Sequence, residues 1–157
     1  GHSTTIYNGE TVKISSGYVV GGNGSAADII GVLNGIFFNA ADTLKPTFSN
    51  FYKATITPAN SEDTTAFVID DPFQQYVVAA DAATGVTTFL ETYDMNTSAG
   101  SDTTGKSSST LDIGTTSADG KQFRMLRSAE DPENEDATAV RHSVIVVSNL
   151  NSFNGHN

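Results

Sequence analysis

The chain has 157 residues and a formal charge of -10, from 18 acidic residues against 8 Lys and Arg. Such a charge repels nucleic-acid phosphates, and no local cluster of basic residues offsets it, so contact with DNA or RNA is not expected. The absence of cysteine excludes disulfides and a thiol nucleophile.

Hydrophobic residues make up 38% of the chain and charged residues only 17%, which leaves a remainder rich in Ser, Thr, Asn and Gly. This mixture suits short strands joined by many turns. The length fits a single domain over residues 1–157. No apolar run approaches the roughly 18 residues that a membrane helix needs, so we expect a soluble, β-rich domain.

The first predicted elements form a hairpin. Residues 10–14 (ETVKI) alternate between apolar and polar, Ser16 and Gly17 interrupt the pattern, and residues 18–20 (YVV) resume it. The glycine-rich stretch 21–25 (GGNGS) then predicts a flexible turn, because glycine adopts positive φ at little cost.

The longest apolar segment, residues 27–38 (ADIIGVLNGIFF), predicts a bent strand or a strand pair with bulges, since its glycines weaken a regular strand. Residues 47–56 (TFSNFYKATI) lie between Pro46 and Pro58, and their aromatic spacing fits either a helical face or a bulged strand. We expect a strand there, because Thr, Phe and Tyr suit a pleated surface.

An Asp-Pro corner is predicted in the middle of the chain. Residues 65–70 (TAFVID) and 74–80 (QQYVVAA) have the composition of strands. Between them, Pro72 fixes its own φ and pushes Asp71 toward extended backbone. Asp70 and Asp71 could also serve as a general acid/base pair, but adjacent strand residues point to opposite faces, which favours turn and cap roles.

Further strands are predicted in the C-terminal half. Residues 86–93 (VTTFLETY) predict a strand or a short helix, and residues 96–109 are the most loop-like part of the chain. Residues 121–128 (KQFRMLRS) alternate as a strand does. The β-branched run 142–150 (HSVIVVSNL) suits the middle of a sheet, with His142 at a sheet surface. Together these runs predict an all-β fold, an antiparallel sandwich or small barrel with long loops and at most one or two short helices.

A second Asp-Pro corner, Asp131 and Pro132, lies within residues 130–136 (EDPENED). The five carboxylates of this segment could bind calcium, but the spacing and central glycine of an EF-hand loop are missing, so a solvated acidic turn is favoured. The chain has 3 histidines, two of them near its ends, which is too few for a convincing metal site or Ser-His-Asp constellation.

Residues 100–107 (GSDTTGKS) match the pattern of a phosphate-binding loop. Such a loop needs a buried strand before its first glycine and a helix that begins at the Lys-Ser. The flanks are instead rich in turn-forming residues, and the acid-ended strand 66–71 that could hold magnesium precedes the loop instead of following it. We therefore expect an irregular loop around Gly105 and Lys106, with no cofactor, no metal and no enzymatic activity.

Six motifs follow one another along the chain: VLNGIFF (32–38), FSNFY (48–52), AFVIDDPFQQYVV (66–78), TTGKSSSTLD (103–112), QFRMLRSAEDPENED (122–136) and VIVVSNLNSF (144–153). In this order they resemble the small virion proteins of tailed bacteriophages that decorate the head. In that family GSDTTGKS corresponds to a TTGRS-like loop, with Lys in place of Arg. Two features differ: FYK stands where relatives often carry Tyr-Trp-Pro, and an APFG-like N-terminal arm is missing from the sequence.

The resemblance implies a cement protein on the outer surface of the virion capsid, where it bridges and stabilises subunits of the major capsid protein. It further implies contacts with neighbouring copies, with a homotrimer preferred, and no contact with nucleic acid or membrane. Six residues are expected to have structural roles in turns and corners: Asp70, Asp71, Pro72, Gly105, Asp131 and Pro132. The sequence does not identify the residues that contact the capsid.

Two other functions stay open at this point. Small β domains also serve as tail-tube or head-fibre subunits, so another phage structural role is an alternative. A carbohydrate-binding β module is the second alternative, with exposed aromatic residues such as Tyr52 and Tyr93 stacking on sugars.

Overall fold

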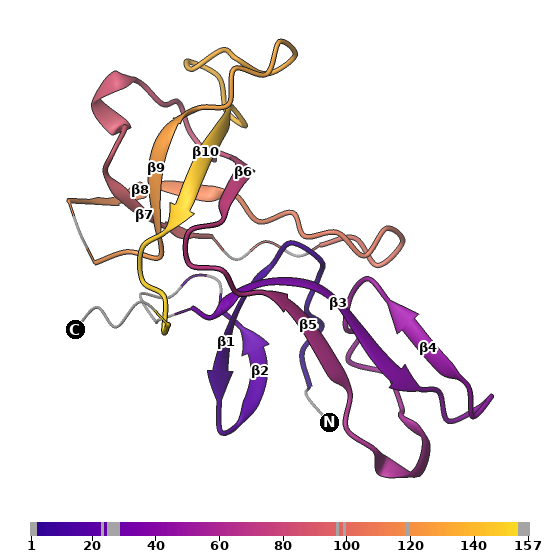
Figure 1. Cartoon of the computed structure of the whole chain (residues 1–157). Coiled ribbons are helices and arrows are strands. Elements are labelled where there is room, and N and C mark those ends of the chain that lie inside the picture. The colour runs from indigo at the N-terminus through magenta and orange to yellow at the C-terminus, as the bar shows by residue number, and fades with distance from the viewer. Residues whose placement is uncertain are drawn as a thin grey trace.

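The protein is mostly β, and its strands form two antiparallel sheets that are not closed into a barrel (Figure 1). The computed structural model describes residues 3–22, 24, 29–96, 98, 100–118 and 120–153. Its helical elements are two single turns of 3-10 helix, η1 (Ala59–Ser61) and η2 (Val86–Thr88). The predicted all-β, sandwich-like class with only short helices is confirmed.

The first sheet contains β1 (Thr11–Ser15), β2 (Tyr18–Gly21), β3 (Gly31–Asn39), β4 (Pro46–Ser49) and β5 (Thr65–Ile69). Strand β3 is its axis: β5 pairs along one edge of β3, while β1 and then β4 pair along the other. Among the described residues, β2 pairs only with β1 and β5 only with β3. Each of these two strands therefore has an outer edge without a strand neighbour.

The second sheet contains β6 (Gln75–Ala79), β7 (Thr92–Met95), β8 (Leu111–Ser117), β9 (Phe123–Ser128) and β10 (Ser143–Ser148). Their order is β6-β10-β9-β7-β8. Strand β10 lies between β6 and β9, as its β-branched sequence predicted. In Figure 1 this sheet occupies the upper half of the molecule and the first sheet the lower half.

The predicted hairpin and the predicted bulge are both present. Ser16 and Gly17 have φ of 51° and 83°, so they form the two-residue turn between β1 and β2 that favours positive φ at both positions. In β3 the pairing with β5 shifts register between Leu33 and Gly35, which marks the bulge. Of the predicted flexible turn at 21–25, residues 23 and 25 lie outside the described residues.

One prediction of local structure is wrong, one segment contains both of its predicted alternatives, and one strand was not predicted. The strand expected over 47–56 ends at Ser49, because the next residues turn out of the sheet and Tyr52 exchanges backbone hydrogen bonds with Ile6. Residues 86–93 hold both alternatives in succession, η2 first and the start of β7 afterwards. Strand β8 was not predicted, because its sequence LDIGTTS is dominated by residues common in turns.

Each sheet has its own apolar core. The core of the second sheet consists of Ile29, Tyr93, Met95, Leu111, Phe123, Met125, Val144 and Val146. The core of the first sheet consists of Ile6, Val12, Ile30, Leu33 and Ile36. Ile29 and Ile30 are adjacent in the chain but enter different cores, because side chains of extended backbone alternate in direction.

Gln122 connects the two sheets through polar bonds. Its side chain is completely buried, its Nε2 donates to the Gly22 carbonyl at 2.5 Å, and its Oε1 accepts from the Met95 N–H at 3.0 Å. Gly22 follows β2 of the first sheet, whereas Met95 ends β7 of the second. The amide thus satisfies one backbone group from each half of the protein, both of which lie away from water.

Within the described part of the chain, no helix has the length and apolar character needed to cross a membrane.

Replacing Gln122 by Leu tests this connection. The variant should lower the free energy of unfolding by roughly 2–4 kcal/mol, because a buried N–H and a buried carbonyl each lose their partner. Urea unfolding measures the change. Gln75→Leu, at an exposed position of β6, is the control and should stay within about 0.5 kcal/mol of the wild type. Equal effects of the two substitutions would contradict the role assigned to Gln122.

Candidate functional site

The GSDTTGKS segment is a compact loop that precedes an extended strand. The Ser101 N–H donates to the Lys106 carbonyl at 2.9 Å, and the Gly105 N–H donates to the Ser101 carbonyl at 2.7 Å. After Lys106 the chain passes through irregular backbone into β8, so within the described residues no helix begins at the Lys-Ser of the motif. The geometry that a phosphate-binding loop requires is therefore missing at this motif.

The loop is held against the first sheet's half of the molecule. Asn8 donates its N–H to the Gly105 carbonyl at 2.8 Å and accepts from the Ser107 N–H at 2.9 Å. Gly105 has φ of 69°, and a Cβ there would lie 2.5 Å from Cδ1 of Phe51. Glycine is thus required at position 105 both by the backbone conformation and by the close approach of Phe51.

A side-chain clasp reinforces this contact. The Tyr7 ring stacks on Phe51 with a centroid distance of 5.8 Å, and its hydroxyl donates to Asp102 at 2.8 Å. Lys53 forms an ion pair with the same carboxylate at 3.3 Å. The hydrogen bond from Tyr7, followed by that from Lys53, lowers the pKa of Asp102, and the bond to Asp102 raises the pKa of Tyr7. The loop is therefore fixed by a charged and aromatic clasp.

The two Asp-Pro corners have the same hydrogen bonds. Asp71 accepts the Phe73 N–H on its side chain at 2.9 Å and the Gln74 N–H on its carbonyl at 3.1 Å. In the second corner the side chain of Asp131 accepts the N–H two residues ahead at 3.1 Å, and its carbonyl accepts the N–H three residues ahead at 2.9 Å. An aspartate before proline thus closes both turns.

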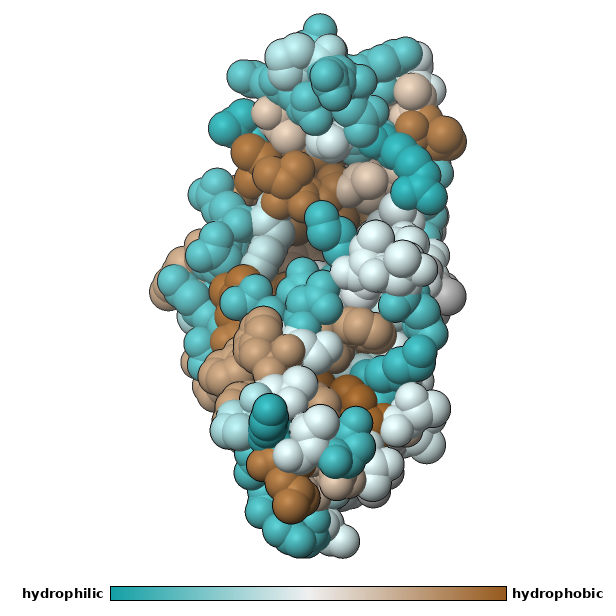
Figure 2. Space-filling model, turned by 90° about the vertical axis from the view of Figure 1, so that its right-hand side faces the viewer, coloured by the Kyte–Doolittle hydropathy of each residue, from teal (hydrophilic) through white to brown (hydrophobic). Residues whose placement is uncertain are grey.

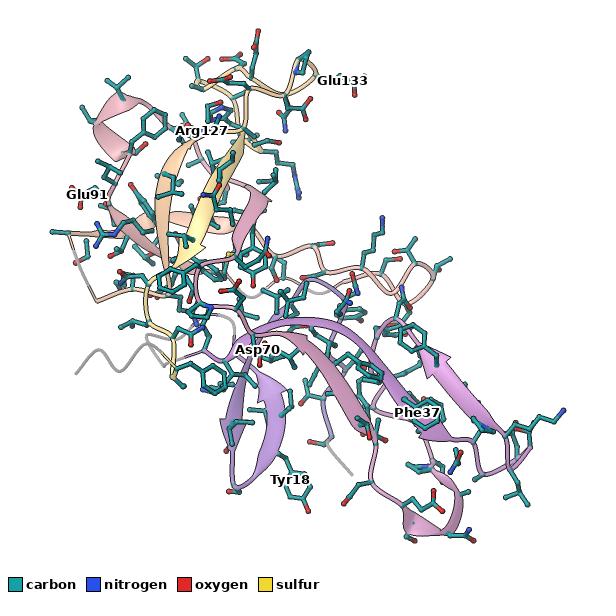
Figure 3. All side chains as sticks on the ribbon, in the orientation of Figure 1. Tyr18, Phe37, Asp70, Glu91, Arg127 and Glu133 are labelled. Carbon is teal, nitrogen blue, oxygen red and sulfur yellow. The ribbon has the colours of Figure 1, made fainter. Side chains whose placement is uncertain are left out.

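These predicted residues do not converge on one site. Figure 3 shows Asp70 where the two sheets meet and Glu133, beside the second corner, at the far end of the second sheet. Gly105 lies in the clasped loop, where it bonds to Asn8 and Ser101. The turn role is observed directly for Asp71 and Asp131, each of which bonds its own turn. Among the described residues, no group of three or more acids or histidines is arranged to hold a metal ion.

The prediction for His142 was wrong. This residue was expected at a sheet surface, but its ring is completely buried, with Nδ1 2.5 Å from the Thr84 hydroxyl and Nε2 2.9 Å from the Ser128 hydroxyl. A threonine beside the imidazole supplies no negative charge to stabilise the imidazolium that a base would form. The Thr84–His142–Ser128 chain is therefore a buried hydrogen-bond network that ties the start of β10 to the end of β9.

The tyrosines considered for sugar binding occupy different environments. Tyr93 is completely buried in the second core, and its hydroxyl donates to the Thr88 carbonyl at 2.9 Å. It cannot stack on a sugar. Tyr52 is half-buried and lines a groove, described below.

An exposed aromatic face covers the outer side of β3, β4 and β5. It consists of Phe37, Phe48, Phe67 and Ile69, which are 38%, 63%, 45% and 37% exposed. Phe48 pairs with Phe37 across the strands, and its ring lies 5.9 Å from that of Phe67. Figure 3 shows Phe37 between β3 and β4, and Figure 2 shows apolar patches over the part of the surface where the first sheet lies.

Gly35 makes this arrangement possible. A Cβ at Gly35 would lie 2.6 Å from Cζ of Phe48, and Gly35 is the cross-strand partner of Phe67. The missing side chain leaves room for the two rings to meet above the backbone. Exposed patches of this kind often mark surfaces for binding other proteins.

A groove of about 890 Å³ opens on the opposite, inner side of the same sheet. Leu33 and Ile36 of the first core line its floor, together with Tyr52 and Ala66. One bank is the β1–β2 hairpin and the other is the segment 61–64 that leads into β5. The groove therefore lies over the core of the first sheet, whose residues Leu33 and Ile36 are themselves only 2% and 1% exposed.

Neither apolar surface was predicted from the sequence. The signal was present in β5, where Ala66 and Val68 point toward the core while Phe67 and Ile69 point away. A strand that is apolar on both faces ordinarily predicts burial on both. Sequence alone does not say that one of these faces stays uncovered.

No protein-family model matches the chain, and searches of curated proteins and of solved structures found no match.

Gly105→Ala and Lys106→Ala separate the structural and the nucleotide-binding interpretations of the loop. Gly105→Ala should lower the free energy of unfolding by roughly 1–3 kcal/mol, because it strains φ and collides with Phe51, whereas Lys106→Ala should change it by less than about 0.5 kcal/mol. Urea unfolding measures both values. Calorimetry with ATP and magnesium completes the test: binding that Lys106→Ala abolishes would contradict a structural loop.

Glu10 predicts a pH dependence of stability. Burial raises the pKa of its carboxyl above the ordinary 4.5, against an opposing hydrogen bond from the Tyr7 N–H. Because the pKa is raised in the folded state, the deprotonated carboxylate lowers the free energy of unfolding. This loss of stability is absent well below pH 4.5 and grows as the pH rises through the folded-state pKa. Glu10→Gln keeps an acceptor for Tyr7 and should gain stability over the wild type between about pH 4 and pH 7, as followed by urea unfolding. Glu133→Gln, at an exposed position, should show no such gain.

Proposed function

We propose that the chain is a cement protein that binds the outer surface of a tailed-phage capsid and stabilises contacts between major capsid protein subunits. The observation that carries the proposal is the exposed aromatic face of the first sheet. Three phenylalanines on adjacent strands expose between 38% and 63% of their surface in one patch. The order of sequence motifs supplies the link to head decoration proteins.

The energetics of such a face suit a protein that acts in many copies. Complete burial of one phenylalanine stabilises a contact by about 1.5–3 kcal/mol, so partial burial of three gives a modest interaction for each copy. Repetition of this contact over a symmetric lattice makes the total stabilisation of the shell large. The charge of -10 keeps an unbound copy soluble and away from packaged DNA.

The rest of the molecule is suited to a mechanical role in supporting the binding surface, and not to catalysis. The Tyr7–Asp102–Lys53 clasp and the buried Gln122 amide fix the second sheet and its loop relative to the first. A rigid body transmits force between the subunits that it bridges, which a cement role requires. We propose a structural role without catalysis on this basis, with a homotrimer as the preferred assembly.

The alternatives give different outcomes in an imaging experiment. A tail-tube or head-fibre subunit would appear as density on the tail or on isolated spikes, and not across the head lattice. The buried position of Tyr93 removes one of the two residues on which the sugar-binding alternative depended.

A binding assay on empty, expanded heads of the encoding virus tests the proposal. Phe48→Ser with Phe67→Ser should weaken docking about thirtyfold, since losing part of two aromatic contacts costs roughly 2 kcal/mol. Co-sedimentation of labelled protein with the heads measures the affinity, and sedimentation velocity of the free protein tests for a trimer.

The matched control removes exposed apolar groups from the other half of the protein. Val86 and Leu90 are 84% and 62% exposed beside η2, and their replacement by Ser should leave docking unchanged. Heads that bind no wild-type protein, or that bind both double variants equally, would contradict the proposal.

A further inference from the structure

We propose that the inner groove of the first sheet binds an extended, apolar peptide segment of a partner protein, flanked by Lys or Arg, which adds a strand to the free edge of β2. This site is on the opposite side of the sheet from the aromatic face. The inference concerns a separate surface and does not depend on the decoration role.

The floor of the groove is apolar. Leu33 and Ile36 are almost fully buried beneath it, and Ala66 contributes only a methyl group, which leaves the hollow above β5. An added strand presents every second side chain to one face, so its apolar residues would point into this hollow. Such an occupant would cover the apolar lining of the groove.

The wall of the groove is a backbone edge. Tyr18, Val19 and Val20 all line it, although side chains on a strand alternate between faces. Three consecutive lining residues mean that the edge of β2 itself forms the bank. Tyr18 lies at the free end of the hairpin, away from the second sheet (Figure 3).

Hairpin geometry identifies the backbone groups that an added strand would use. In a two-residue hairpin the residues that flank the turn, here Ser15 and Tyr18, exchange both hydrogen bonds, and bonded pairs then alternate along the ladder. Val19 is therefore in a non-bonded pair, and its N–H and carbonyl point outward from β1. Val20, paired with Lys13, points its groups inward. Strand addition would engage Val19.

The negative charge on one bank of the groove favours basic residues on either side of the apolar part of the peptide. The charged residues that line the groove are Glu62 and Asp63, both exposed on the bank opposite β2. No cation lies among the described lining residues to neutralise them. Lys or Arg next to the apolar core of the peptide would complement this bank, and acidic flanks would be repelled.

The same electrostatics argue for a different protein as the occupant. A second copy would bring another charge of -10 to an already acidic rim. Like charges brought together at an interface cost free energy, so self-insertion is disfavoured relative to a segment with basic flanks.

Two fluorescent probe peptides test the proposal: Lys-Val-Thr-Val-Thr-Val-Lys and its counterpart with Glu at both ends. Fluorescence anisotropy should show saturable binding of the Lys peptide to the full-length protein, about tenfold or more tighter than that of the Glu peptide. Replacing Glu62 and Asp63 together by Lys should reverse this preference. Because both residues are exposed, the variant should fold as the wild type does. The matched control, Glu133→Lys with Glu135→Lys, makes the same charge change in the distant acidic turn and should leave the preference intact.

Amide exchange of Val19 locates the bound peptide. The Val19 N–H should exchange rapidly in the free protein and slowly with the Lys peptide bound, while the Val20 N–H is protected in both states. Ala66→Phe, which fills the floor, should abolish binding; if this variant unfolds, the Val19 result stands without it.

Several results would overturn the proposal. These are failure of either peptide to bind, a preference that survives the Glu62 and Asp63 substitutions, or protection that appears elsewhere than β2. Slow Val19 exchange in a self-associated protein without peptide would instead identify a second copy as the occupant.

Discussion

The structure depends on one junction, at which consecutive residues serve two cores. Ile29 is fully buried among the strands of the second sheet, and Ile30 packs against the first. The backbone N–H of Ile30 bonds to Val12 of β1, while Ile29 bonds to Leu150 after β10. Gln122 and the clasped loop add polar contacts across the same junction. Because extended backbone alternates its side chains, this short segment contributes to the cores of both sheets.

This mode of attachment leaves the first sheet incompletely covered on both faces. Its outer side presents three phenylalanines to solvent, and its inner side encloses a groove above Leu33 and Ile36. The second sheet has a much smaller hollow of about 130 Å³, which Met95, Phe123 and Val146 help to line. On the proposed function, the first sheet carries the binding surfaces and the second sheet supports it.

Local sequence signals predicted the local structure where one residue determines the backbone. Ser16 and Gly17 specified a two-residue turn, Gly35 marked a bulge, and the Asp before each proline closed a corner. The β-branched run of β10 specified a central strand. Prediction was wrong where distant segments decide the outcome. His142 is buried because Thr84 and Ser128 supply its partners, and β8 pairs with β7 despite a turn-like composition. The aromatic face and the groove exist because no other segment of the described chain covers those parts of the first sheet. No local sequence pattern encodes such an absence.

The central claim is that the first sheet docks and the second supports, and hydroxyl-radical footprinting of protein bound to capsid heads tests it most directly. The account predicts that Phe48 and Phe67 are oxidised in the free protein and protected in the bound protein, while Val86 and Leu90 beside η2 react equally in both. Protection of Val86 and Leu90, with Phe48 and Phe67 still reactive, would contradict it.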